Sequence, residues 1–293
     1  MFVTRPYESH VDFVAMQRLV SRLWFQQAPY VYALPGDLSW WRATTPDDSG
    51  IRRATLWYLD EVLVGFVWRT GDDADILYDT AVPGLASAIM SDVAAHTAPA
   101  GLVYAFDRHV ERRQVLTALG YHKGDPVFRM HIMDPRCAPR YEIPEGWQVC
   151  QLPAGSAANQ ERSEAQRSAF QSTKMTPERY AFARTLPGYT SEWDLVLRTP
   201  AGDIAAFVTI WVDETSNTAH FEPVGCVHAY KRQGLTRLLL CEALRRLALH
   251  DIVTVCVLSA PLSAAHPAGW LYESCGFHLI DHISQWSRVP QDA

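Results

Sequence analysis

The chain has 293 residues, of which 48% are hydrophobic and 20% are charged, and its formal net charge is -6. These values are typical of a folded globular protein with one large domain or two ordinary ones, and they exclude wholesale disorder. The negative charge argues against a nucleic-acid partner held by bulk phosphate attraction, although a local pocket for a small anion stays allowed.

We expect neither a secretion signal nor a membrane-spanning helix in this sequence. Its first residues, MFVTRPYESHVDFV, lack a basic start followed by an apolar core. No apolar run approaches the roughly 20 residues of a spanning helix. The six cysteines show no metal-ligand spacing. We therefore expect a cytoplasmic, reduced protein with no metal, no membrane and no nucleic acid among its partners.

A proline-rich stretch at residues 134–147, DPRCAPRYEIPEGW, divides the chain into two halves. Its prolines interrupt helices and sheets, which predicts a linker. Each half contains, in the same order, an extended piece, a helical stretch, paired strands across a tight turn, a helix, an apolar strand, a second helix and a glycine–aromatic end. This shared order predicts a duplicated α/β (α+β) fold around mixed sheets, with domains at 1–138 and 141–293.

In the first half, we expect an extended piece at 2–5, a strand pair at 54–59 and 62–68, and an apolar strand at 102–106. The helix that follows the strand pair is expected within 79–92, DTAVPGLASAIMSD, which contains no Lys or Arg. An anion at its start would therefore find no counter-charge.

In the second half, the matching pieces are expected at 147–152, at 193–198 paired with 204–212, and at 252–258. Between the last two, FEPVGC at 221–226 reads as the end of a strand. A loop follows, and Gly234 opens an apolar-faced helix of about four turns.

Three cations, Lys231, Arg232 and Arg237, lie around the start of this helix. Cations at the positive end of a helix dipole cost stability unless an anion is expected there. A strand followed by a loop and a helix N-terminus presents backbone N–H groups to such an anion. Neither GxxxxGK[ST] nor GxGxxG is present. The alternative interpretation is a solvated cationic turn.

The stretch at 222–240, EPVGCVHAYKRQGLTRLLL, resembles the acetyl-CoA-binding segment of the GNAT superfamily of acyl-CoA N-acyltransferases. In that family, [RQ]-x-x-G-x-[GA] lies between the fourth strand and the third helix, and its amides hold the CoA pyrophosphate. Lys231 replaces the usual Arg or Gln here, and Thr236 replaces Gly or Ala. The resemblance implies acetyl-CoA as cosubstrate, bound by Gly225, Cys226, Val227, Lys231, Arg232, Gln233, Gly234, Leu235, Thr236 and Arg237.

A second resemblance lies at 270–277, WLYESCGF, which is similar to the LYExxGF end of GNAT enzymes. It implies that Tyr272 reprotonates the leaving thiolate, as a neutral phenol can do at pH 7. The alternative is that Tyr272 only packs its helix against the sheet.

Members of the family often use a carboxylate on the fourth strand as the base, and Glu222 stands at that place. His220, two residues earlier, is the other titratable candidate, and both should point to one face of the strand with Phe221 on the other. Pro223 is expected to distort the strand after Glu222. A surface carboxylate at a strand end is the alternative. The resemblance also implies an oxyanion donor at the N–H of Cys226 or Val227.

The acceptor pocket of this fold is walled by its first two helices and their loop, here 156–189. Tyr189 and Trp193 could line that pocket, although closing the core is the commoner outcome. In the first half, Leu116 stands where the catalytic tyrosine would be. We therefore expect the first half to be a degenerate copy that serves packing or shapes the acceptor site.

The resemblance implies direct transfer of an acetyl group to a primary amine of a small-molecule or peptide acceptor, by a monomer or homodimer. One alternative is a CoA-binding sensor without catalysis. Another is transfer of a longer acyl group, or transfer to a non-amine acceptor. The presence of both Tyr272 and Glu222 favours an enzyme over a CoA-binding sensor, because a protein that only binds CoA needs neither residue.

Overall fold

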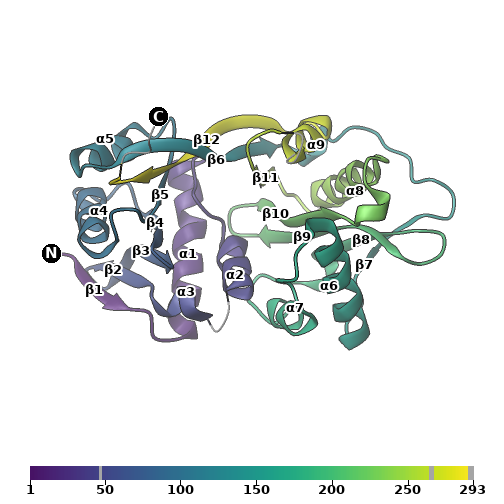
Figure 1. Cartoon of the computed structure of the whole chain (residues 1–293), viewed down its shortest axis with the longest axis horizontal. Coiled ribbons are helices and arrows are strands. Elements are labelled where there is room, and N and C mark those ends of the chain that lie inside the picture. The colour runs from purple at the N-terminus through teal and green to yellow at the C-terminus, as the bar shows by residue number, and fades with distance from the viewer. Residues whose placement is uncertain (46–47, 264–266, 290–293) are drawn as a thin grey trace.

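A computed structural model describes residues 1–45, 48–263 and 267–289. Across these residues, twelve strands form one continuous sheet in the order β1-β2-β3-β4-β5-β12-β6-β11-β10-β9-β8-β7. The sheet runs along the molecule from the first half of the chain to the second (Figure 1). None of the described helices combines the length and hydropathy that crossing a bilayer requires.

The two halves contain the same strands in the same order. The first half supplies β1 Val3–Pro6, β2 Thr55–Leu59, β3 Val62–Thr70, β4 Asp73–Tyr78, β5 Val103–Phe106 and β6 His122–Met133. The second half supplies β7 Gln148–Gln151, β8 Asp194–Arg198, β9 Ile204–Asp213, β10 Thr218–Cys226, β11 Thr254–Ser259 and β12 His278–Ser287. In each half the fourth and fifth strands pair in parallel, whereas the other neighbouring strands are antiparallel. The predicted mixed α/β fold with an internal repeat is confirmed.

The last strand of each half pairs with the fifth strand of the other half. β6 lies antiparallel to β11, with Met133 opposite Val255, and β12 lies antiparallel to β5, with Ile283 opposite Phe106. β6 and β12 also pair with each other. The boundaries at 138 and 141 stay a prediction, and each half of the sheet includes one strand that comes from the other half of the chain.

The helices of the first half are α1 His10–Gln27, α2 Pro35–Thr44, α3 Ser49–Arg52, α4 Leu85–His96 and α5 Val110–Ala118. Of these, α2 packs on α7, β9 and β10 of the second half. Gly36 allows this close approach, because a Cβ atom at this position would lie 2.1 Å from Cβ of Trp211 on β9. A helix of the first half therefore covers part of the second half's sheet.

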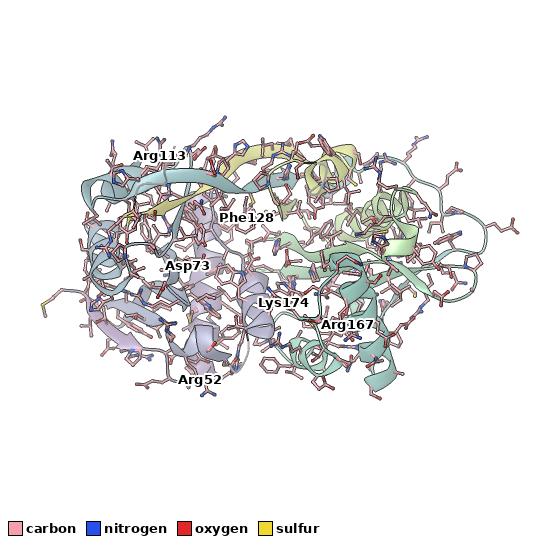
Figure 2. The ribbon with its side chains drawn as sticks, viewed as in Figure 1. Arg52, Asp73, Arg113, Phe128, Arg167 and Lys174 are labelled. Atoms are coloured by element: carbon pink, nitrogen blue, oxygen red, sulfur yellow. The ribbon has the colours of Figure 1, made fainter. Side chains whose placement is uncertain are left out.

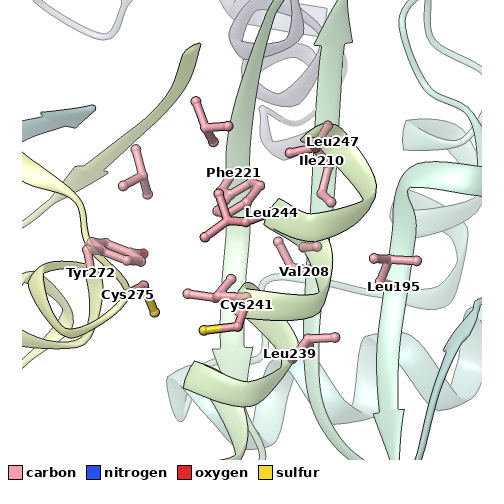
Figure 3. Packing of buried hydrophobic residues seen from close by; sticks show 14 of the residues in the cluster. Leu195, Val208, Ile210, Phe221, Leu239, Cys241, Leu244, Leu247, Tyr272 and Cys275 are labelled. Atoms are coloured by element: carbon pink, nitrogen blue, oxygen red, sulfur yellow. The ribbon is translucent and has the colours of Figure 1, made fainter. Parts of the chain in front are cut away.

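The helices of the second half are α6 Ser156–Phe170, α7 Pro177–Ala183, α8 Leu235–Leu249 and α9 Ala268–Ser274. Side chains alternate between the two faces of β9, as strand geometry requires. Val208 and Ile210 pack in the cluster beneath α8, whereas Phe207 and Trp211 belong to a cluster with α6 and α7 residues on the opposite face. Figure 3 shows α8 over β9 and β10 with the first of these clusters between them.

Candidate active site

The predicted alternation along β10 is present. Phe221 is fully buried in the cluster beneath α8, where it lies close to Leu244 (Figure 3). His220 and Glu222 contact α2 on the opposite face. The pairing register of β10 with β9 shifts between Phe221 and Val224, which places the expected distortion at Pro223.

His220 forms an ion pair with Asp37 in the first turn of α2. The distance from His220 Nδ1 to Asp37 Oδ1 is 2.9 Å. The other Asp37 oxygen accepts a hydrogen bond of 2.6 Å from the backbone N–H of Leu34, which fixes the carboxylate at the helix start. Burial lowers the pKa of His220, but the negative charge of Asp37 outweighs it, so this pKa lies above its ordinary value. The arrangement favours a positively charged imidazole.

Glu222 is half-buried beside this pair. Burial raises the pKa of Glu222 to about 7, while the charge of His220 lowers it and the charge of Asp37 raises it. Its backbone carbonyl accepts a hydrogen bond of 2.7 Å from Trp211 Nε1, which fixes this part of β10. A carboxylate that titrates near neutral pH can accept a proton from an amine and release it again.

Tyr272 lies in α9 and is only 5% exposed. Its ring contacts His131 and Phe277, with centroid distances of 6.0 and 5.9 Å. Figure 3 shows the ring directed toward Phe221 on β10. Burial raises the pKa of Tyr272 well above its ordinary value, and the negative charge of Glu222 raises it further. The phenol is therefore neutral, and it packs α9 against its neighbours. The proton-donor role of Tyr272 stays a prediction.

β10 and β11 separate next to these side chains. They pair only from Thr218 to His220 on β10 and from Thr254 to Cys256 on β11, although both strands continue further. The N–H of Val227 donates to the carbonyl of Ala205 at 2.9 Å. Alternation along an antiparallel pair then directs the N–H of Cys226 toward the gap between β10 and β11. Of the two expected oxyanion donors, the one that faces this gap is Cys226.

The loop after β10 is anchored on the end of α6. Lys231 Nζ donates to the carbonyl of Ala169 at 2.9 Å, and the N–H of His228 donates to Ser168 Oγ at 3.2 Å. Gly234 precedes α8 with φ +76°, a conformation that favours glycine. Among the described residues, no group accepts a hydrogen bond from the N–H groups of 232–237. These amides form the candidate anion cradle.

The other side chains of the predicted CoA segment have mixed surroundings. Arg237 Nε donates to the carbonyl of Ser274 at 3.1 Å, and Gln233 Nε2 lies 3.5 Å from the carbonyl of Ala229. Arg232 is exposed. Burial raises the pKa of the Cys226 thiol, although a hydrogen bond with Thr236 opposes this. The thiol therefore stays protonated, which disfavours Cys226 as a nucleophile.

Two cavities meet at this point, and they share Trp40, Thr44 and Glu222 among their lining residues. The smaller one, about 260 Å³, is lined on its far side by α6, α7 and their loop, including Arg167, Lys174 and Arg179. The larger one, about 480 Å³, extends into the first half of the chain. In Figure 2, Asp73 lies on the first-half side of α2, whereas Lys174 and Arg167 lie on the second-half side.

Part of the wall predicted at 156–189 lines the smaller cavity, whereas α2, which was not predicted there, lines both cavities. Asp37 and Trp40 come from a helix about 180 residues earlier in the chain. An acidic residue close to a tryptophan pair, in DLSWW at 37–41, was the signal in the sequence. Trp193 is buried in the core cluster beneath α8, and Tyr189 donates to Asp194 at 2.8 Å, so these two aromatics support the core.

In the first half, the start of α4 has the same backbone conformation as the start of α8, but no Lys or Arg lies around it at 79–92. Gly84 precedes α4 with φ +76°, as Gly234 precedes α8. Leu116, at the position matching Tyr272, is buried in the apolar core.

One group of potential metal ligands in the described residues consists of Asp107, Asp281 and His282. It lies where β12 pairs with β5, and Lys123 forms an ion pair with Asp107 at 2.8 Å.

A duplicated mixed sheet in which two parallel strands separate beside an amide-rich loop and a helix start defines the tandem GNAT fold, and the chain has this fold. Comparison with solved structures gives the same result. A tandem GNAT protein from the clavulanic acid biosynthesis pathway, determined without AcCoA, is 14% identical, with a TM-score of 0.65 and full coverage of both chains.

Two further structures are similar over nearly their whole length. A GCN5-related N-acetyltransferase from Sphaerobacter thermophilus is 16% identical, with a TM-score of 0.62 over 99% of this chain and 97% of that one. A GNAT-family acetyltransferase from Colwellia psychrerythraea is 11% identical, with a TM-score of 0.66 over 97% and 99%. Comparison of the sequence with protein-family models and with curated proteins finds no match. The likeness is therefore one of fold.

Proposed function

We propose that the chain is an acetyl-CoA-dependent N-acetyltransferase that moves an acetyl group directly to a primary amine. The observation that carries the proposal is the position of Glu222, a carboxylate with a pKa of about 7, where the two cavities meet beside the gap between β10 and β11. The similarity to solved GNAT acetyltransferases supports the same reaction class.

The backbone amides of 232–236 would hold the CoA pyrophosphate, since these N–H groups have no partner among the described residues and lie at the start of α8. Lys231 then acts mainly by anchoring the loop to α6, because its ammonium group is engaged by Ala169. Gly225, Cys226 and Val227, at the end of β10 and just after it, would lie along the pantetheine arm.

In the reaction, the neutral amine nitrogen attacks the thioester carbonyl carbon, a C–N bond forms and the C–S bond breaks. Glu222 takes the proton that the amine loses, and Tyr272 gives a proton to the departing thiolate. The N–H of Cys226 donates to the oxyanion of the tetrahedral intermediate. His220 acts through Glu222, because Asp37 favours its charged form and a charged imidazole cannot accept a proton.

A panel of primary amines with acetyl-CoA and detection of free thiol tests the proposal. We expect thiol release that depends on the amine, together with a higher melting temperature in the presence of acetyl-CoA. A raised melting temperature without release from any amine would indicate a CoA-binding sensor. Release only with longer acyl-CoA, or only with hydroxyl or thiol acceptors, would indicate one of the other transferases. Cytoplasmic location and the monomeric or dimeric state stay predictions.

A further inference from the structure

The larger cavity beside Glu222 carries an excess of negative charge. Its lining includes four carboxylates, those of Asp37, Asp73, Asp75 and Glu222, of which Asp37 pairs with His220. Asp73 and Asp75 lie on β4 of the first half, and Glu222 lies on β10 of the second. The same cavity is therefore lined by Glu222 and by an acidic region formed by Asp73 and Asp75.

The carboxylate of Asp75 has no bonding partner in the described part of this acidic region. Among the described residues, no hydrogen bond or ion pair engages the Asp75 carboxylate. Asp73 accepts a hydrogen bond of 2.9 Å from the N–H of Leu102. Burial and then the charges of Asp73 and Asp75 raise the pKa of Tyr104 above its ordinary value, so the phenol beside these carboxylates stays neutral. Burial raises the pKa of Asp75 to about 7; Arg112 lowers it, whereas the charges of Asp73 and Asp37 raise it. A bound cation would relieve this repulsion.

Arg112 is the one basic residue among the described residues that line this cavity. Its side chain is 1% exposed and stacks on the ring of Tyr32, with the guanidinium carbon 3.9 Å from the ring centroid. It also donates to the carbonyl of Ile76 at 2.8 Å. These contacts fix the guanidinium of Arg112 in the wall of the larger cavity. Its single positive charge does not balance the four carboxylates that line the same cavity.

The rest of the lining suits a cation with an aliphatic body. The rings of Trp40, Trp68 and Tyr104 line the cavity, and aromatic faces attract ammonium groups. Ser259 also lines it; this residue is 4% exposed, and its hydroxyl has no hydrogen-bond partner in the described part of the chain. A buried hydroxyl without a partner is uncommon in native proteins and can accept an N–H from a ligand.

We propose that the acceptor is a diamine, whose first amine reacts beside Glu222 while its second, protonated amine binds at Asp73 and Asp75. This inference rests on the function proposed above and names its substrate class. The first amine loses one proton to Glu222 and gains the acetyl group, CoA leaves with a proton from Tyr272, and the second amine keeps its charge throughout. The first half of the chain thereby selects the acceptor.

The test compares straight-chain diamines of three to eight carbons with n-alkylamines of the same length, by kcat/KM with saturating acetyl-CoA. We expect the best diamine to exceed its matched monoamine by roughly ten- to a hundredfold, the range for a charge-assisted hydrogen bond. Asp75→Asn and Asp73→Asn should each raise KM for that diamine about tenfold or more, and should lower the ratio of diamine to monoamine kcat/KM by about the same factor. Asp72→Asn, an exposed neighbour in the preceding turn, is the matched control and should change neither.

Equal efficiency for diamines and monoamines in the wild-type protein would overturn the inference while leaving the proposed function intact. The wild-type comparison decides even if one aspartate variant fails to fold. A protein that shows no melting-temperature increase with acetyl-CoA and acetylates no amine would overturn the proposed function, and this inference with it.

Discussion

At the scale of single residues, the proposed centre depends on the buried His220–Asp37 pair, on the half-buried Glu222 and on the buried Tyr272. Asp37 favours the charged form of His220, and that charge lowers the pKa of Glu222, which burial and Asp37 raise to about 7. On the other side of β10, Tyr272 is kept neutral by burial and by the negative charge of Glu222. In the proposed reaction, the Glu222 carboxylate would accept a proton and the Tyr272 phenol would donate one at neutral pH.

Replacing Tyr272 by Phe should lower kcat by roughly a hundredfold or more, because the departing thiolate loses its proton donor. Affinity for acetyl-CoA, measured by titration calorimetry, should stay within about twofold of wild type. Tyr121→Phe is the matched control, since this buried tyrosine of the first half also has a hydroxyl without a partner among the described residues. Unchanged kcat in Tyr272→Phe would exclude the proton-donor role.

Asp37→Asn should destabilise the protein in a pH-dependent way. The pKa of His220 is raised in the folded state, so its stabilisation is fully present below the unfolded value of about 6.5 and is lost as pH rises through the folded value. The difference in unfolding free energy between wild type and Asp37→Asn, from urea titrations, should therefore be larger at pH 6 than at pH 9. A difference that grows with pH would show that the pair does not stabilise the charged imidazole.

At the scale of elements, the loop after β10 and the helix α8 could be predicted from the sequence, whereas the packing of α2 against β10 could not. The helix of about four turns expected from Gly234 is α8, and the opposite orientation of His220 and Phe221 follows from strand alternation. Local periodicity holds no information about a contact between Asp37 and His220, which lie in different halves of the chain. The predicted wall of the acceptor pocket, at 156–189, therefore included only elements from the same half of the chain as β10.

The cradle can be tested with a pair of equivalent glycines. Gly234 and Gly84 both have φ +76° before a helix, and no atom lies within 4 Å of a Cβ built on either. Alanine at either position should cost about 1 kcal/mol of stability, because only the backbone conformation is strained. Only Gly234→Ala should weaken acetyl-CoA binding, measured by calorimetry. Equal loss of binding in Gly84→Ala would contradict the assignment of the cradle to the second half.

At the scale of the whole molecule, the exchange of β6 and β12 joins two copies of one plan into a single sheet. Sequence repetition predicted the two copies, but not the exchange, because β6 and β12 carry no local feature that specifies a partner in their own half or in the other. The first half has no Lys or Arg at 79–92, where the second half has its charged cradle. Through α2 and β4 it forms one wall of the larger cavity.

The shared sheet should make the two halves unfold together. Both neighbours of β12, the strands β5 and β6, belong to the first half, and β6 is also one of the two neighbours of β11. Unfolding of the first half would therefore leave β12 without a partner and β11 with an unpaired edge. We expect a single urea transition that coincides when followed by circular dichroism and by tryptophan fluorescence. Two separate transitions would show that the halves are independent domains despite the exchanged strands.

The central claim, that Glu222 is the base of an acetyl transfer at the junction of the two halves, is tested most directly by the pH dependence of amine-dependent thiol release. Activity requires the deprotonated carboxylate, so kcat/KM should rise with pH through a pKa near 7. In Glu222→Gln, we expect this limb to disappear and the rate at pH 8 to fall by roughly a hundredfold or more. A Glu222→Gln protein with the wild-type rate and the wild-type limb would contradict the claim.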